Sequence, residues 1–193
     1  MKRGSLFILC IIFLAKIVTC QTKNISLIGG GGLSIHGTGD LSGYSFFNQV
    51  DIPFGKRFFL SPGIQFTNNS QTNFLTSDIR LNYVTSGIDF FTNIQYLVLN
   101  KSHHRIAIGV GPLLRFENSS YPREVSSNLG TSGEQILRLT YDPLHSTSLG
   151  YNVAPSYYYQ PAKRFFIGAK INLQNDTKAN IITSELVFVG IKL

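Results

Sequence analysis

Apolar and polar residues alternate with a period of two over most of the chain that follows residue 20. The pattern is clearest in 164–174, where one face carries Ile167, Ala169, Ile171 and Leu173. Alternation of this kind is typical of a β-strand with one polar and one apolar face, and we find no helical periodicity. Eight such segments predict an all-β chain: 25–36, 44–54, 58–67, 78–98, 105–117, 149–160, 164–174 and 181–193.

One of these segments, 78–98, changes phase along its length. Leu81 and Tyr83 share one phase, whereas Ile88 and Phe90 follow the other. A β-bulge inserts one residue and reverses the faces of a strand. The phase change therefore predicts a bulge near Ser86-Gly87.

The connections between the segments alternate between short and long. Tight turns are expected at 53–56, 100–102 and 161–163, and longer polar connections at 37–43, 68–77, 118–145 and 175–180. Short turns at one end and longer loops at the other are typical of membrane β-barrels, and the segments are long enough to cross a bilayer at a tilt. The sequence thus predicts an eight-stranded antiparallel up-and-down transmembrane β-barrel.

A soluble barrel of lipocalin type would show the same alternation with its apolar face inward. Two features favour the membrane. Small residues share a face with charged ones, which predicts a polar lumen with a ladder of paired charges: Asp51, Asp89, Arg115, Glu117 and Lys170. Aromatic residues lie at the strand ends of the apolar face, as interfacial girdles require: Phe54, Tyr96, Tyr157 and Tyr159 near the turns, and Tyr44 and Phe116 near the loops. Eight strands leave room for side chains but not for a diffusion channel.

The first 20 residues have the pattern of a cleaved secretory signal peptide, with Lys2 and Arg3 before a short apolar run. The barrel domain would then be 21–193; an alternative retains Cys20 as a lipidated first residue. Both cysteines, Cys10 and Cys20, lie in this segment, which excludes a disulfide scaffold, a Cys-ligated zinc site and a thiol enzyme from the domain. No Lys/Arg-rich run supports nucleic-acid binding, and nothing indicates a cofactor.

Several segments resemble the small outer-membrane β-barrel proteins of Bacteroidetes, which often bear the label "porin family". Val50–Ile64 is similar to the second hairpin of that family, Ile106–Leu114 to its fifth strand and Arg164–Lys170 to its seventh. Gly190–Leu193 resembles its ending. The resemblance implies an OmpA-like barrel in the outer membrane of a Gram-negative envelope, and it supplies no catalytic residues.

The long segment 118–145 is the most distinctive connection. Within it, 134–141 is expected to extend as a hairpin above the membrane, and rigid scaffolds commonly present binding residues on such loops. We expect a monomeric, non-enzymatic envelope component in contact with outer-membrane lipid. Its outer loops would bind a protein or glycan through Glu134, Arg138, Tyr141 and His145.

One alternative function is a lipid-modifying hydrolase of the same fold. His145 would activate a nearby serine, and Glu134 or Glu185 would orient the imidazole. A secreted soluble ligand-binding barrel is the other alternative.

Overall fold

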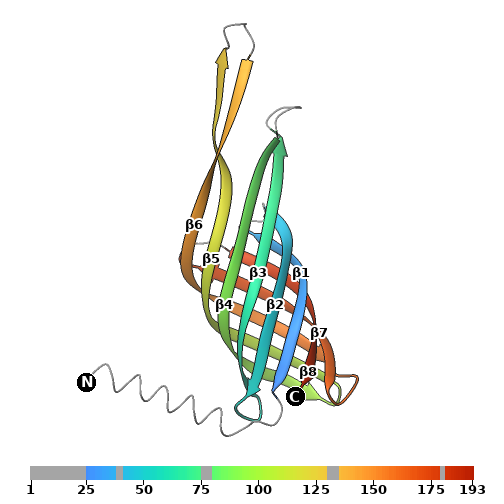
Figure 1. The fold of residues 1–193 in the computed structure, drawn as a ribbon. Coiled ribbons are helices and arrows are strands. Elements are labelled where there is room, and N and C mark those ends of the chain that lie inside the picture. Colours follow the sequence, from blue (N-terminus) through green and yellow to red (C-terminus); the bar gives the residue numbers. More distant parts are fainter. Residues whose placement is uncertain (1–24, 38–40, 75–79, 130–134, 179–180) are drawn as a thin grey trace, which may run out of the picture.

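The protein forms a single closed β-barrel in which each strand pairs with its neighbours in sequence and β8 returns to β1 (Figure 1). The computed structural model describes residues 25–37, 41–74, 80–129, 135–178 and 181–193. Within these ranges, no helix is long and apolar enough to span a bilayer. The strands are β1 (Ser26–His36), β2 (Leu41–Pro53), β3 (Phe58–Phe74), β4 (Arg80–Lys101), β5 (His104–Leu129), β6 (Gln135–Tyr159), β7 (Phe165–Asp176) and β8 (Ile181–Lys192).

The predicted eight-stranded antiparallel architecture is confirmed. Closure is complete, because β1 and β8 pair in register from Ser26↔Lys192 to His36↔Ile182. A closed barrel satisfies every backbone group of its wall without an exposed edge. The expected signal peptide and Cys20 lie outside the described residues.

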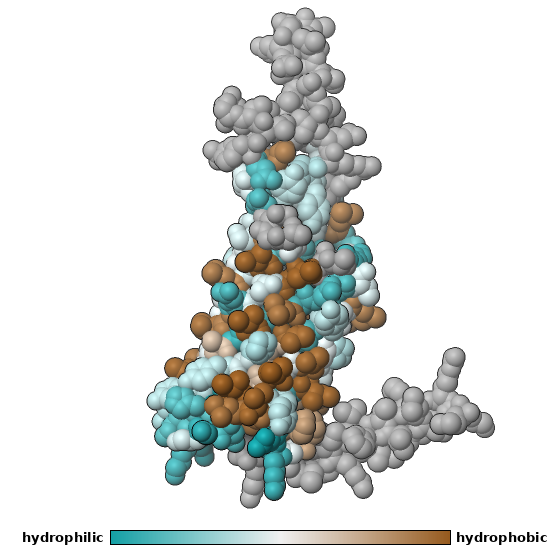
Figure 2. Space-filling view, turned by 180° about the vertical axis from the view of Figure 1, so that it is seen from behind, coloured by the Kyte–Doolittle hydropathy of each residue, from teal (hydrophilic) through white to brown (hydrophobic). Residues whose placement is uncertain are grey.

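The wall has an apolar outside and a polar inside. Leu33, Val187 and Val189 are among many large apolar side chains that point outward and are exposed, whereas Gln65, Asp89 and Asn152 point inward and are fully buried. Figure 2 shows the outer apolar residues as a belt between two hydrophilic ends. The soluble alternative is therefore wrong about the faces, since a lipocalin-like cavity needs an apolar interior.

The expected bulge near Ser86-Gly87 is also wrong. The β3–β4 register is continuous from Arg80 to Tyr96, and the irregularity of β4 against β5 lies between Leu97 and Leu99 instead. The phase change has another cause. Above the apolar belt, the apolar residues Leu81 and Tyr83 lie on the inner side of β4, in phase with the buried Thr85 and Asp89, whereas Ile88 and Phe90 lie on the outer side.

The strands on one side of the barrel extend far beyond the membrane-facing wall. β5 and β6 remain paired up to Leu129↔Gln135, whereas β7 pairs with β6 only up to Gly150↔Asp176. The pair therefore rises above the barrel as a two-stranded ribbon, as Figure 1 shows. Segment 118–145, which we predicted as a long loop with a hairpin in it, is largely a continuation of two strands. We call the paired segments 120–129 and 135–144 the outer hairpin.

Inward-pointing apolar side chains close the end of the lumen near the short turns. Phe47, Tyr158, Phe166 and Phe188 pack there with Ile28, Leu97, Ala107 and Leu186. The rings of Tyr158 and Phe188 are 5.1 Å apart, and those of Phe166 and Phe188 are 6.4 Å apart in an edge-to-face arrangement. Gly190 makes room for this plug, because a Cβ there would lie 2.2 Å from Phe166 Cζ.

Candidate functional site

The centre of the lumen holds a buried ion pair between β4 and β5. Arg115 Nε donates to Asp89 Oδ1 at 2.7 Å, and Nη2 donates to Asp89 Oδ2 at 2.6 Å. Nη2 also donates to Gln174 Oε1 of β7 at 2.9 Å, which ties the pair across the lumen. Both charged side chains are at most 1 % exposed. Such a bidentate pair holds neighbouring strands in one register and occupies the space that a channel would need.

Asp51 and Lys170 are joined through an amide rather than directly. Gln49 Nε2 donates to Asp51 Oδ1 at 2.6 Å, and Lys170 Nζ donates to Gln49 Oε1 at 3.2 Å. Asp51 Oδ1 also accepts from Ser61 Oγ at 2.7 Å. The Lys170 ammonium lies 3.6 Å from the centre of the Phe47 ring, a cation–π contact that links this layer to the aromatic plug.

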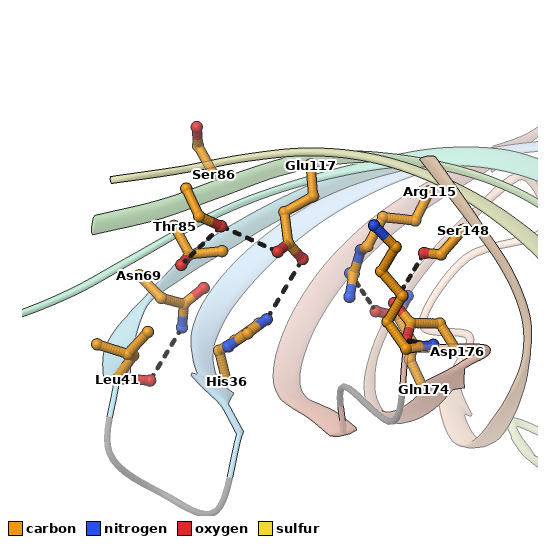
Figure 3. Close-up of polar contacts among 12 residues, drawn as sticks. His36, Leu41, Asn69, Thr85, Ser86, Arg115, Glu117, Ser148, Gln174 and Asp176 are labelled. Carbon is orange, nitrogen blue, oxygen red and sulfur yellow. Dashed lines mark hydrogen bonds and ion pairs between the residues drawn. The ribbon is translucent and has the colours of Figure 1, made fainter. Parts of the chain in front are cut away.

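The fifth predicted lumenal charge, Glu117, lies near the outer mouth with a partner that the sequence analysis did not identify. His36 Nε2 of β1 and Glu117 Oε2 of β5 are 3.4 Å apart, and Figure 3 shows the two side chains pointing toward one another. Glu117 also accepts a hydrogen bond from Ser119 Oγ at 2.9 Å. Strands β1 and β5 are not neighbours in the barrel, so alternation alone does not bring these residues together.

The four residues expected in the girdle at the turn end are all partly exposed on the outer wall. Tyr96 packs on Phe58 with ring centres 5.2 Å apart, and Phe58 stacks on Phe54 at 5.8 Å. Tyr157 and Tyr159 gather around His104, whose Nδ1 lies 2.7 Å from the Tyr157 hydroxyl. The Tyr96 and Tyr157 rings have an apolar body on the wall and a hydroxyl that bonds Arg57 or His104 at the turns, which is the arrangement suited to a membrane interface.

The opposite boundary of the belt also carries aromatic rings. Asn68 Nδ2 donates to the Tyr44 hydroxyl at 3.0 Å, and Phe116 packs edge-to-face on Phe90 at 6.1 Å. From Tyr44 to Phe54 the chain spans a height of about 25 Å, at about 3.3 Å per residue and a tilt of about 40°. This height matches the apolar band of an outer-membrane barrel, which is about 25 Å tall.

Three of the residues proposed for outer-loop binding, Arg138, Tyr141 and His145, lie along the outer part of β6. Tyr141 is exposed, and its hydroxyl accepts a hydrogen bond from the Asn82 backbone N–H at 3.4 Å. Arg138 pairs with Ser126, and His145 with Asn118 at the base of the hairpin. Glu134 lies outside the described residues. The hairpin thus presents Tyr141 and the exposed Leu144 on a ribbon fixed at its base by the barrel.

The groups of the hydrolase alternative that the structure describes are not assembled, and its candidate acid Glu134 lies outside the described residues. His145 makes no hydrogen bond to a carboxylate or hydroxyl among the residues that the structure describes. Ser148 instead points into the lumen and donates to Asp176 Oδ2 at 2.8 Å. Glu185 lies on the outer face of β8 beside Ile171 of β7, in the apolar belt. In the described part of the chain, no three His, Cys, Asp or Glu side chains group as metal ligands.

Comparisons with known proteins place the fold but not a family. No protein-family model matches the chain, and no curated protein matches it. Among solved structures, Ail, the attachment invasion locus protein of Yersinia pestis, has a TM-score of 0.53 at 8% identity, covering 90% of this chain and 100% of that one. OprG from Pseudomonas aeruginosa has a TM-score of 0.53 at 13% identity over 89% and 97%. Neisserial surface protein A has a TM-score of 0.52 at 12% identity, covering 88% of this chain and 96% of that one.

For two of these solved barrels a location or a bound ligand is known. OprG is described as an outer membrane protein, and Ail has also been crystallised in complex with the heparin analogue sucrose octasulfate. At these identities the likeness shows the fold alone. The class that the chain's own features define is a small closed barrel with an apolar belt, a filled polar lumen and a projecting β5–β6 hairpin.

Proposed function

We propose that this protein is an integral outer-membrane β-barrel without catalytic activity, which anchors the outer hairpin at the cell surface as a monomer. The observation that carries the proposal is the distribution of residues in the wall, which is the reverse of that in a soluble barrel: the outer face is apolar, and the lumen is polar and filled. Burying the exposed apolar belt in lipid is favourable, whereas leaving it in water is not. The short turns would face the periplasm and the long extensions the outside, following the general pattern of such barrels.

The outer hairpin is the part of the molecule that would bind a partner, a protein or a glycan. Its base is rigid because Asn118↔His145 continues the ladder of the barrel wall without interruption. Its outer edge on β6 has no neighbour from β7 beyond Gly150 in the described part of the chain. An open strand edge together with exposed Tyr141 and Leu144 suits recognition of an extended chain or a sugar ring. The glycan-analogue complex of Ail supports a glycan as one of these partner classes.

Two measurements test the proposal in order. The membrane fraction is first run on gels cold and boiled, and a band whose mobility changes on boiling is expected in the detergent-insoluble fraction. A soluble band that is indifferent to boiling would contradict membrane insertion.

Binding is then tested with the barrel in lipid nanodiscs on an array that includes heparin, and by photo-cross-linking in cells at Leu144. The matched cross-linking control is Val187, which is exposed on the lipid-facing belt. We expect a retained glycan, or a protein adduct at Leu144 that is missing at Val187. Adduct yields equal at the two positions, with no glycan retained, would contradict the binding role of the hairpin.

A further inference from the structure

The charges of the chain are separated between the two ends of the barrel. The turn segments 54–58, 100–105 and 160–164 contain six Lys or Arg and no Asp or Glu. The segments of the opposite end, 37–43, 68–80, 118–145 and 175–180, contain four Lys or Arg and six Asp or Glu. One end is therefore cationic, while the other is mixed with a slight acidic excess. The five exposed cations at the turns, which we call the basic collar, are Lys56, Arg57, Lys101, Lys163 and Arg164.

One member of the basic collar, Arg57, lies at the level of the inner aromatic girdle and on the outer wall. Arg57 Nη1 donates to the Tyr96 hydroxyl at 3.2 Å, and Tyr96 is one of the outward-facing rings of the belt. This bond directs the guanidinium toward the membrane interface rather than toward the lumen axis. Figure 2 shows the hydrophilic surface of this end directly below the apolar belt.

The collar is also spread around the circumference. Its residues come from the β2–β3, β4–β5 and β6–β7 turns, which alternate around the closed sheet. Two further cations belong to the lumen mouth instead: Arg105 lies 5.0 Å from the centre of the Tyr158 ring, and Lys192 Nζ donates to Gln160 Oε1 at 2.6 Å. A compact soluble anion would need cations that converge on one point. A ring of cations at interface height fits a planar array of anions.

From this arrangement we infer that the basic collar binds the phosphates of anionic phospholipid headgroups in the leaflet that surrounds the turns. The inference rests on the proposed membrane insertion, with the turns at one interface. Each Lys or Arg close to an anionic leaflet attracts it enough to change lipid occupancy about fivefold. The collar would thus surround the turn end of the barrel with anionic lipid and fix its depth in the membrane.

The test is lipid selectivity, measured by electron paramagnetic resonance of spin-labelled lipids around the full barrel in vesicles. Spin-labelled phosphatidylglycerol is compared with spin-labelled phosphatidylcholine. For the wild type we expect the phosphatidylglycerol probe to be enriched at the protein a few-fold, with enrichment falling at high salt. The collar variant should lose most of it: Lys56→Gln, Arg57→Gln, Lys163→Gln and Arg164→Gln.

The matched control neutralises the same number of cations at the other end: Arg80→Gln, Arg123→Gln, Arg138→Gln and Lys178→Gln. It should keep the enrichment. If the fourfold collar variant does not fold, the double variant Lys163→Gln with Arg164→Gln should reduce the enrichment partially. The fall of enrichment at high salt tests the inference on the wild type, with no variant needed.

Equal association of both probes with the folded wild type would overturn the inference and would point to a soluble polyanion as the ligand of the collar. Loss of enrichment in the control alone would overturn it as well. The mobility shift on boiling, measured on the same samples, keeps this result separate from a failure of the proposed function. A wild type without that shift would contradict membrane insertion itself.

Discussion

Removing one charge from the lumen should destabilise the barrel far more than removing both. Arg115→Met keeps most of the apolar stem of the side chain but leaves Asp89, which is fully buried, without its guanidinium. It also removes the donor to Gln174. Breaking a buried ion pair by removing one partner costs about 3–5 kcal/mol, because an uncompensated charge remains in a poorly solvating site. We therefore expect Arg115→Met to lower the free energy of unfolding by about 3–5 kcal/mol.

The double variant Arg115→Met with Asp89→Leu leaves no buried charge. Apolar replacement of a whole buried pair is often close to neutral, so we expect it to recover most of the loss. The assay is equilibrium unfolding in urea from lipid vesicles, followed by circular dichroism, since the chain contains no Trp for fluorescence. Lys163→Met in an exposed turn is the control and should change little. A single variant as stable as the wild type, or a double variant as unstable as the single, would refute the reasoning.

Three further predictions use the same unfolding assay. Gly190→Val places side-chain atoms against the ring of Phe166, and overpacking a filled core costs about 1–3 kcal/mol; Phe166→Leu in the same chain should restore part of it, and additive losses would contradict the steric account. Val187→Arg puts a charge on the lipid-facing belt and should cost about 2–4 kcal/mol, whereas Thr72→Arg, beyond the belt, should cost almost nothing; equal costs would argue against lipid contact. Replacement of 122–141 by a short Asn-Gly turn should leave the unfolding midpoint nearly unchanged, because the outer hairpin lies above the barrel wall. A large loss would show that the hairpin stabilises the barrel.

The barrel itself could be predicted from the sequence, because lipid on one side and a polar lumen on the other produce a strict alternation. Ile167, Ala169 and Ile171 show it with no exception. Phe188 interrupts the same pattern in β8, and the structure explains the exception, since Phe188 belongs to the plug at the turn end. A single inward ring has no signature in periodicity; only a glycine opposite it, Gly168, where a Cβ would lie 2.4 Å from Phe188 Cζ, indicates the space that the ring needs.

Periodicity predicted less above the membrane. There both faces of a strand meet water, so alternation ends although strand pairing continues. Segment 118–145 was therefore predicted as a long loop with a short hairpin in it, not as the continuation of two strands. Tyr83 lies in this region, and its ring packs on that of Tyr121 on the neighbouring strand with centres 6.1 Å apart. Because Tyr83 is apolar and on the inner side, the pattern of apolar residues shifts there without a bulge.

The pairing of lumenal groups depends on which strands meet across the closed barrel. Asn172 Nδ2 of β7 donates to Gln65 Oε1 of β3 at 2.7 Å, just as His36 of β1 meets Glu117 of β5. Such pairs are set by the stagger of the closed sheet, which the sequence of one strand does not contain. The alternation of residues along each strand thus predicted that a polar lumen exists, but not which of its residues are partners.

The central claim is that the apolar face of the wall contacts lipid while the other face fills the lumen. Single cysteines placed in turn at 186–191 along β8, in a chain with Cys10 and Cys20 replaced, can carry a nitroxide label for measurement of oxygen and nickel-chelate accessibility in vesicles. The account predicts high oxygen and low nickel accessibility at 187, 189 and 191, and low values of both at 186, 188 and 190. Nickel accessibility at 187, 189 and 191 as high as in an exposed turn would show that the belt faces water and would contradict the account.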